Sequence, residues 1–335
     1  MKKGVGVRCF WDARQRKHAP SVEFFNGALH PAAEQASRVD AILAAIGRTE
    51  APGDAGIAPI ARVHAPDYLA FLGTAHDRWR EVGRAGDAFA YAFPVVGRRA
   101  VHLQRIDALL GRHSFDTATP IGPDTWEAAY WSAQSALAAV DAVISGERAA
   151  FALCRPPGHH AGADYCGGYS YLSNAAICAG AAIAAGKRSV AILDVDYHHG
   201  NGTQDMVAGQ DGVAFVSIHA DPAMDYPYYW GHADESRGNI LNLPLPRNTD
   251  WPAYQPALIQ ALDWIEGRGP DLLIVSYGAD THEADPISHF KLRTSDYARM
   301  ARRIAALGLP TLILMEGGYA IDALGANVAE FLGGF

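Results

Sequence analysis

Residues 189–202 read SVAILDVDYHHGNG, and this stretch indicates the fold more clearly than any other part of the chain. It begins with a short, continuous apolar run, which is typical of a strand covered by helices on both faces. The run passes directly into a cluster of aspartate, histidine and glycine residues. At the end of a strand, residues two apart point to the same side, so we expect Asp194, Asp196 and His198 to share a face.

The same alternation of apolar runs and helix-like segments extends to both sides of this stretch. Strand-like runs occupy residues 4–10, 149–153, 189–194, 213–218, 271–276 and 311–315. Helix-like segments occupy residues 32–46, 126–144, 174–185, 252–266, 295–307 and 321–332. This order predicts an α/β fold, with a multi-stranded, mainly parallel sheet that carries helices on both faces. We expect a single domain over residues 1–335, with a surface loop insertion at about 84–123, where little periodicity is visible.

The composition narrows the class of protein. The chain has 335 residues, 49% of them hydrophobic, and a net charge of −8. This charge disfavours nucleic acid as a partner and modestly favours a small cationic ligand. No apolar stretch is long enough to span a membrane, no signal peptide is visible, and the four cysteines show no paired spacing. We therefore expect a cytoplasmic protein with reduced thiols and no membrane contact.

Further polar clusters follow other strand-like runs, at residues 155–169, 219–221, 277–285 and 316–319. In a parallel sheet, loops at the carboxyl ends of the strands meet at one edge, where function gathers. These clusters are therefore expected to build one site.

The residue types in two of the clusters suit a metal ion. Asp280 follows the run 271–276 and could join Asp196 and His198 in a site with two carboxylates and one imidazole. Three protein ligands leave a position open for water, as in catalytic zinc sites. The alternative is a polar loop with capping carboxylates, and for Asp285, which precedes a proline, we expect only a turn role.

Two other clusters suit proton transfer and oxyanion binding. His159 and His160 follow a rigid Pro-Pro-Gly turn, and a paired imidazole unit could take a proton from water and return it to an amine. Tyr319 follows Gly317-Gly318 and could donate its hydroxyl to a developing oxyanion. A solvent-facing histidine pair and an ordinary turn are the respective alternatives.

Five motifs, at residues 155–162, 167–174, 194–205, 278–286 and 316–319, resemble those of the arginase-like deacetylase superfamily, which contains the histone deacetylase family. The resemblance is strongest to bacterial acetylpolyamine amidohydrolases. It implies one zinc ion held by Asp196, His198 and Asp280, with His160 as general base and acid. It further implies that His159 orients the water and that Tyr319 binds the acetyl oxygen.

The resemblance also implies roles for residues around this centre. Asp194 would support His159, and Asn201 would support His160, at a position where many family members carry aspartate. The implied substrate-binding residues are Phe25, Asp107, Gly168, Tyr169 and Tyr226. Structural potassium or sodium ions would be bound by Asp194, Asp196, His198, Ser217 and Ile218, and by carbonyls of Val207, Gln210 and Val213.

The expected function is zinc-dependent hydrolysis of N-acetylated polyamines or diamines to acetate and the free amine. The insertion would form a homodimer that narrows the mouth, where Asp107 would meet a distal ammonium. A deacetylase of acetyl-lysine in peptides or proteins is the alternative substrate reading. An arginase-like enzyme with two metal ions would need further carboxylates where this chain has His199 and His282. A non-catalytic protein that only binds acetylated ligands would not need Tyr319 or the histidine pair.

Overall fold

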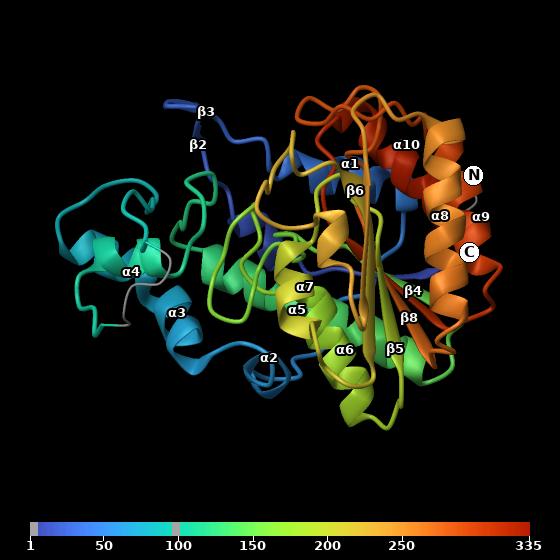
Figure 1. Cartoon of the computed structure of the whole chain (residues 1–335). Coiled ribbons are helices and arrows are strands. Elements are labelled where there is room, and N and C mark those ends of the chain that lie inside the picture. Colours follow the sequence, from blue (N-terminus) through green and yellow to red (C-terminus); the bar gives the residue numbers. More distant parts are fainter. Residues whose placement is uncertain (1–5, 96–100) are drawn as a thin grey trace.

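The computed structural model describes residues 6–95 and 101–335 and has a seven-stranded sheet at its centre (Figure 1). The strand order is β1-β4-β9-β8-β5-β6-β7, and every pairing is parallel. The strands are β1 (Arg8–Phe10), β4 (Ala149–Ala152), β5 (Val190–Asp194), β6 (Val213–Ala220), β7 (Ile240–Leu245), β8 (Leu272–Tyr277) and β9 (Thr311–Met315). The predicted α/β fold is confirmed.

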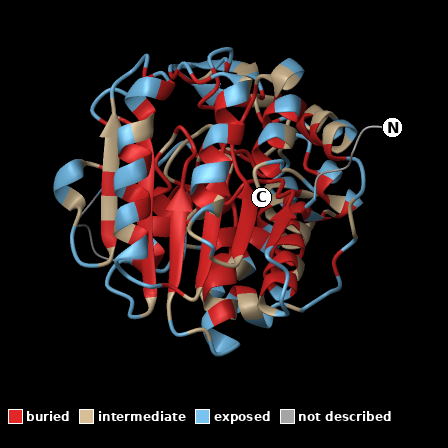
Figure 2. Cartoon of the chain, turned by 90° about the vertical axis from the view of Figure 1, so that its right-hand side faces the viewer, coloured by how far each residue is buried: buried red, intermediate tan, exposed pale blue. Residues whose placement is uncertain are grey.

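Helices cover both faces of this sheet, which leaves its strands buried (Figure 2). One face packs against α1 (Ser37–Ile46), α8 (Trp251–Glu266), α9 (Thr294–Ala305) and α10 (Ile321–Leu332). The other packs against α5 (Thr125–Ile144), α6 (Asn174–Ala184) and α7 (Asn201–Val207). In β5, Ala191 and Leu193 enter the first core and Val190 and Ile192 the second, so both faces of the strand are apolar up to Asp194.

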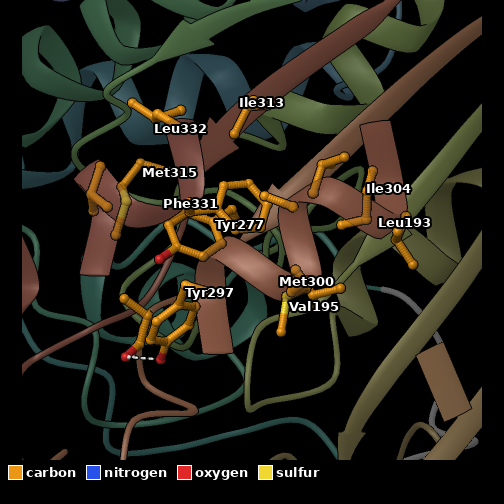
Figure 3. Close-up of a cluster of buried hydrophobic side chains, with 14 of the residues drawn as sticks. Leu193, Val195, Tyr277, Tyr297, Met300, Ile304, Ile313, Met315, Phe331 and Leu332 are labelled. Carbon is orange, nitrogen blue, oxygen red and sulfur yellow. Dashed lines mark hydrogen bonds between the residues drawn. The ribbon is translucent and has the colours of Figure 1, made fainter. Parts of the chain in front are cut away.

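The core beneath α9 and α10 also anchors a functional loop. Phe331 stacks on Tyr277, the last residue of β8, at a ring-centre distance of 3.9 Å (Figure 3). Tyr297 of α9 donates its hydroxyl to the Ala279 carbonyl at 3.0 Å and lies 2.9 Å from the Thr281 hydroxyl. Well-packed aromatic rings thus fix the chain where it leaves β8, just before Asp280.

Several elements differ from the prediction. The segment 84–123 is not only a surface loop, because it contains α4 (Ile106–Arg112), whose Ile106 and Leu110 are buried against α3 (Pro66–Glu81). The helix predicted to start at residue 32 begins at Ser37, and residues 4 and 5 of the first predicted strand lie outside the described residues. Short elements without a clear period were also missed: the hairpin of β2 (Val22–Phe25) and β3 (Ala28–Pro31), α2 (Ala58–Ala61), and the 3-10 helices Ala13–Lys17 and Ala233–Glu235.

Two further misses have specific causes. The edge strand β7 contains Pro244 and is only partly buried, so it lacks the continuous apolar run of the inner strands. Helix α7 begins inside the polar cluster, where apolar periodicity is absent. All four cysteines are free, in line with the absence of paired spacing, and the structure shows that all four are buried. Among the described residues, no helix has the length and apolar character needed to cross a bilayer.

Candidate active site

A pocket of about 460 Å³ opens at the edge of the sheet where the strands end. Loops that follow β4, β5, β8 and β9 contribute to it or to the groups directly beneath it. The predicted residues on its wall are Phe25, His159, His160, Gly168, Tyr169, His198, Tyr226 and Tyr319. Most of the clusters predicted to converge therefore do so, because parallel strands place their carboxyl ends together. The cluster at 219–221 does not reach the pocket wall, because the His219 ring is turned to Ser217 and the Gly231 carbonyl.

Asp196, His198 and Asp280 lie at the base of this site. One potential ligand atom from each falls within 4.8 Å of the others. Nδ1 of His198 is 3.1 Å from Oδ2 of Asp280 and 3.5 Å from Oδ1 of Asp196. Both carboxylates are fully buried, whereas the imidazole is partly exposed toward the pocket.

This arrangement fits a metal ion. Among the described residues, no lysine or arginine pairs with Asp196 or Asp280, and burial and the Asp196 charge raise the pKa of Asp280 to about 7. Two buried carboxylates side by side are costly without a cation. Glycine also gives them room: a Cβ on Gly278 would come within 2.0 Å of Oδ2 of Asp196, and one on Gly317 within 2.5 Å of Oδ2 of Asp280. Carboxylate oxygens and an imidazole suit a borderline divalent ion such as zinc.

The rings of His159 and His160 lie beside this triad, with 4.0 Å between their centres and a tilt of 52° between their planes. Nδ1 of His159 lies 3.1 Å from Oδ2 of Asp194, and Nδ1 of His160 lies 2.6 Å from Oδ1 of Asn201. Burial, with the neighbouring rings of His159 and His198, holds the pKa of His160 well below its usual range. A buried, neutral His160 with Nδ1 engaged can accept a proton at Nε2.

The loop that carries Tyr319 is held by three groups whose contacts were not predicted from the sequence. The guanidinium of Arg38 donates to the carbonyls of Gly318, at 2.7 Å, and Glu316, and lies under the Tyr319 ring. Oδ2 of Asp285 accepts from the Tyr319 amide at 2.7 Å, so Asp285 does more than form a turn. The Glu316 carboxylate accepts from the Gly158 amide at 2.7 Å and ties this loop to the histidine loop.

Asp107 was predicted to lie at the mouth of the pocket, and the structure places it elsewhere. Asp107 is absent from the pocket wall, because its buried carboxylate pairs with Arg84 and, at 2.8 Å, with Arg105. Two other carboxylates, Glu23 and Asp116, line the pocket instead. Neither sits in a recognisable motif. Glu23 lies on the unpredicted hairpin and Asp116 on the insertion, so no local signal could have selected them.

Asp116 holds the pocket wall together. Its Oδ2 accepts from the Gly168 amide at 2.7 Å and from the Tyr226 hydroxyl at 2.8 Å. Gly168 has a φ of +52°, and a Cβ there would come within 2.1 Å of the His160 ring, so this approach requires glycine. Tyr169 follows with a φ of +65° and places its ring edge to face with that of Tyr319.

The residues predicted to bind monovalent cations have other partners in the structure. Asp194 and Ser217 are neighbours in the paired strands β5 and β6, as the first site requires, but the Ser217 hydroxyl is 2.8 Å from Nδ1 of His219. The second set does converge. However, the three carbonyls of this second site all accept from Nδ2 of Asn239. The distances are 2.7 Å for Val207, 3.3 Å for Gln210 and 2.8 Å for Val213. These carbonyls thus share one amide donor, and their binding of an ion stays a prediction.

Residues 30–335 match the histone deacetylase domain. The chain belongs to the histone deacetylase family. It is 48% identical to acetylpolyamine amidohydrolase 1 of Pseudomonas aeruginosa, over 96% of each chain. It is 42% identical to the acetylpolyamine amidohydrolase of Mycoplana ramosa, over 98% of this chain and 99% of the relative.

A solved structure agrees with the family assignment. The crystal structure of acetylpolyamine aminohydrolase from Burkholderia pseudomallei superposes with a TM-score of 0.93 at 40% identity, covering 98% of both chains. The family's members are metal-dependent hydrolases of amides, and the chain is therefore an amide hydrolase of this kind. The predicted family and enzyme class are confirmed.

Proposed function

We propose that this enzyme is a zinc-dependent deacetylase that converts N-acetylated polyamines or diamines to acetate and the free amine. The observation that carries the substrate proposal is the charge of the pocket wall. Glu23 and Asp116 face the pocket, and no arginine or lysine among the described residues pairs with either. The names of the most similar relatives point to the same substrate class.

The pocket can recognise a distal ammonium through these two carboxylates. A third acid on the wall, Asp225, is neutralised by Arg247 at 2.8 Å, so the uncompensated charge comes from the other two. Burial raises the pKa of both Glu23 and Asp116, and a nearby cation would favour their charged forms. In a partly desolvated pocket such an ion pair is stronger than the roughly 0–1 kcal/mol of an exposed pair.

The reaction follows from the groups at the base of the pocket. Zinc held by Asp196, His198 and Asp280 would make water nucleophilic near neutral pH and polarise the acetyl carbonyl. His160 would take the proton of the attacking water at Nε2 and then deliver it to the leaving amine. Tyr319 would donate its hydroxyl to the developing oxyanion, and His159, oriented by Asp194, would position the water.

An arginase-like site with two metal ions would need further ligands at the positions of His282 and His199, and neither side chain is directed at the triad. Nδ1 of His282 accepts from the Ala284 amide at 3.2 Å, and its ring stacks toward Tyr297, away from the pocket. The ring of His199 packs against His219 with 4.6 Å between centres. Within residues 6–95 and 101–335, the triad is the one cluster of three suitable ligands. Metal analysis should therefore find one ion per chain, and a requirement for two would support the arginase-like reading.

The substrate proposal can be tested with acetate release from matched acetamides. N-acetylputrescine carries a distal ammonium, whereas N-butylacetamide has similar length and no charge. Glu23→Gln should raise KM for the charged substrate about tenfold or more and change KM for the neutral one little. Asp107→Asn removes the same charge outside the pocket and should leave the ratio unchanged. Equal losses for both substrates would refute recognition by charge, and faster cleavage of acetyl-lysine peptides would favour the alternative substrate.

A further inference from the structure

A single buried carboxylate connects the loop of the proposed base with the loop of the proposed oxyanion donor. Glu316 directly follows β9, and its side chain is fully buried. Its Oε2 accepts from the amides of Gly158, at 2.7 Å, and His159, at 3.2 Å. Its Oε1 accepts from the hydroxyl of Ser276 in β8 at 3.1 Å. Three donors from two distant segments therefore meet at one carboxylate, which does not itself line the pocket.

The backbone of Glu316 is fixed independently of its side chain. Its amide donates to the carbonyl of Tyr277, the last residue of β8, at 2.8 Å, and its carbonyl accepts from the guanidinium of Arg38. The amide of the next residue, Gly317, donates to Oδ2 of Asp196 in the triad at 2.8 Å. The Glu316 side chain thus projects from a point whose position is set relative to the triad.

The amides of Gly158 and His159 depend on this side chain. Neither amide has another hydrogen-bond acceptor among the described residues. The carbonyl of His159 accepts from the Thr203 amide of α7 at 3.0 Å. The segment is therefore held between α7 and Glu316. A change in the length of the Glu316 side chain must move His159 and, with it, His160.

The contacts of Glu316 require an acceptor of a given reach more than they require a charge. The guanidinium of Arg38 pairs with the Glu34 carboxylate and donates to the backbone carbonyl of Glu316. Burial raises the pKa of Glu316 to about 7, yet Oε2 can accept from both amides whether the group is ionised or protonated. A buried amide without an acceptor is costly, so the two amides of the segment follow the position of this oxygen.

We infer that Glu316 is a positioning residue whose side chain holds the His159-His160 segment at a fixed distance from the loop of Tyr319. It thereby sets the spacing between the histidines that transfer the proton and the hydroxyl that binds the acetyl oxygen. The inference rests on the proposed roles of His160 and Tyr319, and it assigns a function to a side chain outside the pocket wall.

Two substitutions separate the reach of Glu316 from its charge. Glu316→Gln removes the charge but keeps an acceptor oxygen at the same distance, so kcat should stay within about threefold of the parent value. Glu316→Asp keeps the charge but withdraws both oxygens by one methylene group, so the histidines must shift. Because a misplacement of about 1 Å can cost 10²-fold in rate, Glu316→Asp should lower kcat by about 10- to 100-fold and leave KM within about twofold. Equal activity of the two variants, or the reverse order, would overturn the inference.

The matched control is a second carboxylate that accepts from two successive amides. Oδ2 of Asp271 accepts from the amides of Arg188, at 2.7 Å, and Ser189, at 3.3 Å. These residues directly precede β8 and β5, at the end of the sheet opposite to the pocket. Asp271→Asn removes the charge there, and Asp271→Glu changes the side-chain length by one methylene group. Both should change Tm at most, and a loss of kcat like that of Glu316→Asp would show a general effect of loosening the sheet and overturn the inference.

Crystal structures of the zinc-loaded parent and of Glu316→Asp measure the position directly. In the variant, His159 and His160 should be displaced relative to Tyr319, while the triad keeps its geometry. Zinc analysis should still find the parent amount of metal, so that the loss of kcat does not reflect a loss of the ion. A reduced kcat with the histidines in their parent positions would contradict the inference.

Further variants separate the ways in which the inference can fail. If Glu316→Asp does not fold, Ser276→Ala removes the donor to Oε1 and should give a smaller loss of kcat at unchanged KM, whereas a parent-like kcat would then overturn the inference. His160→Ala and Tyr319→Phe should both lose most of their acetate release. If either keeps near-parent turnover, the proposed mechanism fails. If both are impaired and Glu316→Asp is as active as the parent, only the inference about Glu316 fails.

Discussion

Among single residues, Tyr319 offers the simplest test of the chemistry. Its ring is buried between Arg38 and Tyr169, so Tyr319→Phe removes the hydroxyl without disturbing the packing. Losing one oxyanion donor costs about 10²–10³ in kcat, and we expect that loss with little change in KM. Steady-state acetate release measures both constants. Near-parent turnover would show that the hydroxyl is structural.

Under the proposed mechanism, we expect the contact between Asn201 and His160 to set the pH range of the reaction. A carboxylate stabilises the imidazolium form and raises the pKa of its partner, whereas a neutral amide does so less. Asn201→Asp should therefore raise the pKa of His160, which is held low by burial. Because the base must be neutral, activity would then be lost at a higher pH as the solution is acidified.

The measurement is a pH profile of kcat for the parent and for Asn201→Asp. We expect the acidic limb of the profile to shift toward higher pH by about one unit in the variant. An acidic limb that stays in place would indicate that His160 is not the group that must be neutral.

At the scale of elements, the strand-end loops work because glycine lets two of them approach the same carboxylates. Gly317 follows β9, and its amide donates to Oδ2 of Asp196 at 2.8 Å. Gly317→Ala would place a Cβ within 2.7 Å of that oxygen and within 2.5 Å of Oδ2 of Asp280. The loop must move, so we expect the metal affinity and kcat to fall by about tenfold or more.

Calorimetric metal titration and thermal unfolding together check this prediction. The matched control is Gly73→Ala in α3, where the nearest side-chain atoms lie 4.0 Å from the new Cβ. Alanine in a helix should leave metal binding intact and stabilise the protein by up to about 1 kcal/mol. A Gly317→Ala variant that binds metal as tightly as the parent would contradict the close-approach argument.

For the whole molecule, the metal is expected to contribute to stability as well as to catalysis. The triad joins loops that follow β5 and β8, and without a metal its two buried carboxylates have only the imidazole of His198 between them. Removing the metal with a chelator should abolish acetate release and lower Tm by several degrees. A ligand that binds only the folded state stabilises it by about 4 kcal/mol at a thousandfold excess over Kd.

One equivalent of zinc per chain should restore both Tm and activity, which differential scanning calorimetry and the acetate assay would show. Full activity in the chelated protein would rule out a catalytic metal. The predicted homodimer, the structural monovalent cations and the cytoplasmic location remain predictions at this scale. Analytical ultracentrifugation of the purified chain tests the first of them.

The sequence alone sufficed for six of the seven strands of the sheet and for the grouping of residues at the centre of the site. The apolar run 189–194 and its neighbours encode buried strands locally, and the polar residues that follow each run mark where the strand ends. Since parallel strands end at one edge, Asp196, His198 and Asp280 can be grouped from their positions after these runs. These features depend on short-range pattern and on a general rule of sheet topology.

Only the tertiary structure decided which charges the substrate pocket presents. Asp107 was chosen by position along the chain, but α4 turns it toward Arg84 and Arg105, while Glu23 and Asp116 reach the pocket from other segments. The sequence likewise contained no sign that the Asn239 amide would donate to the carbonyls of the predicted cation site. The direction in which a side chain points in an irregular loop depends on packing between segments distant in sequence, and no local period records it.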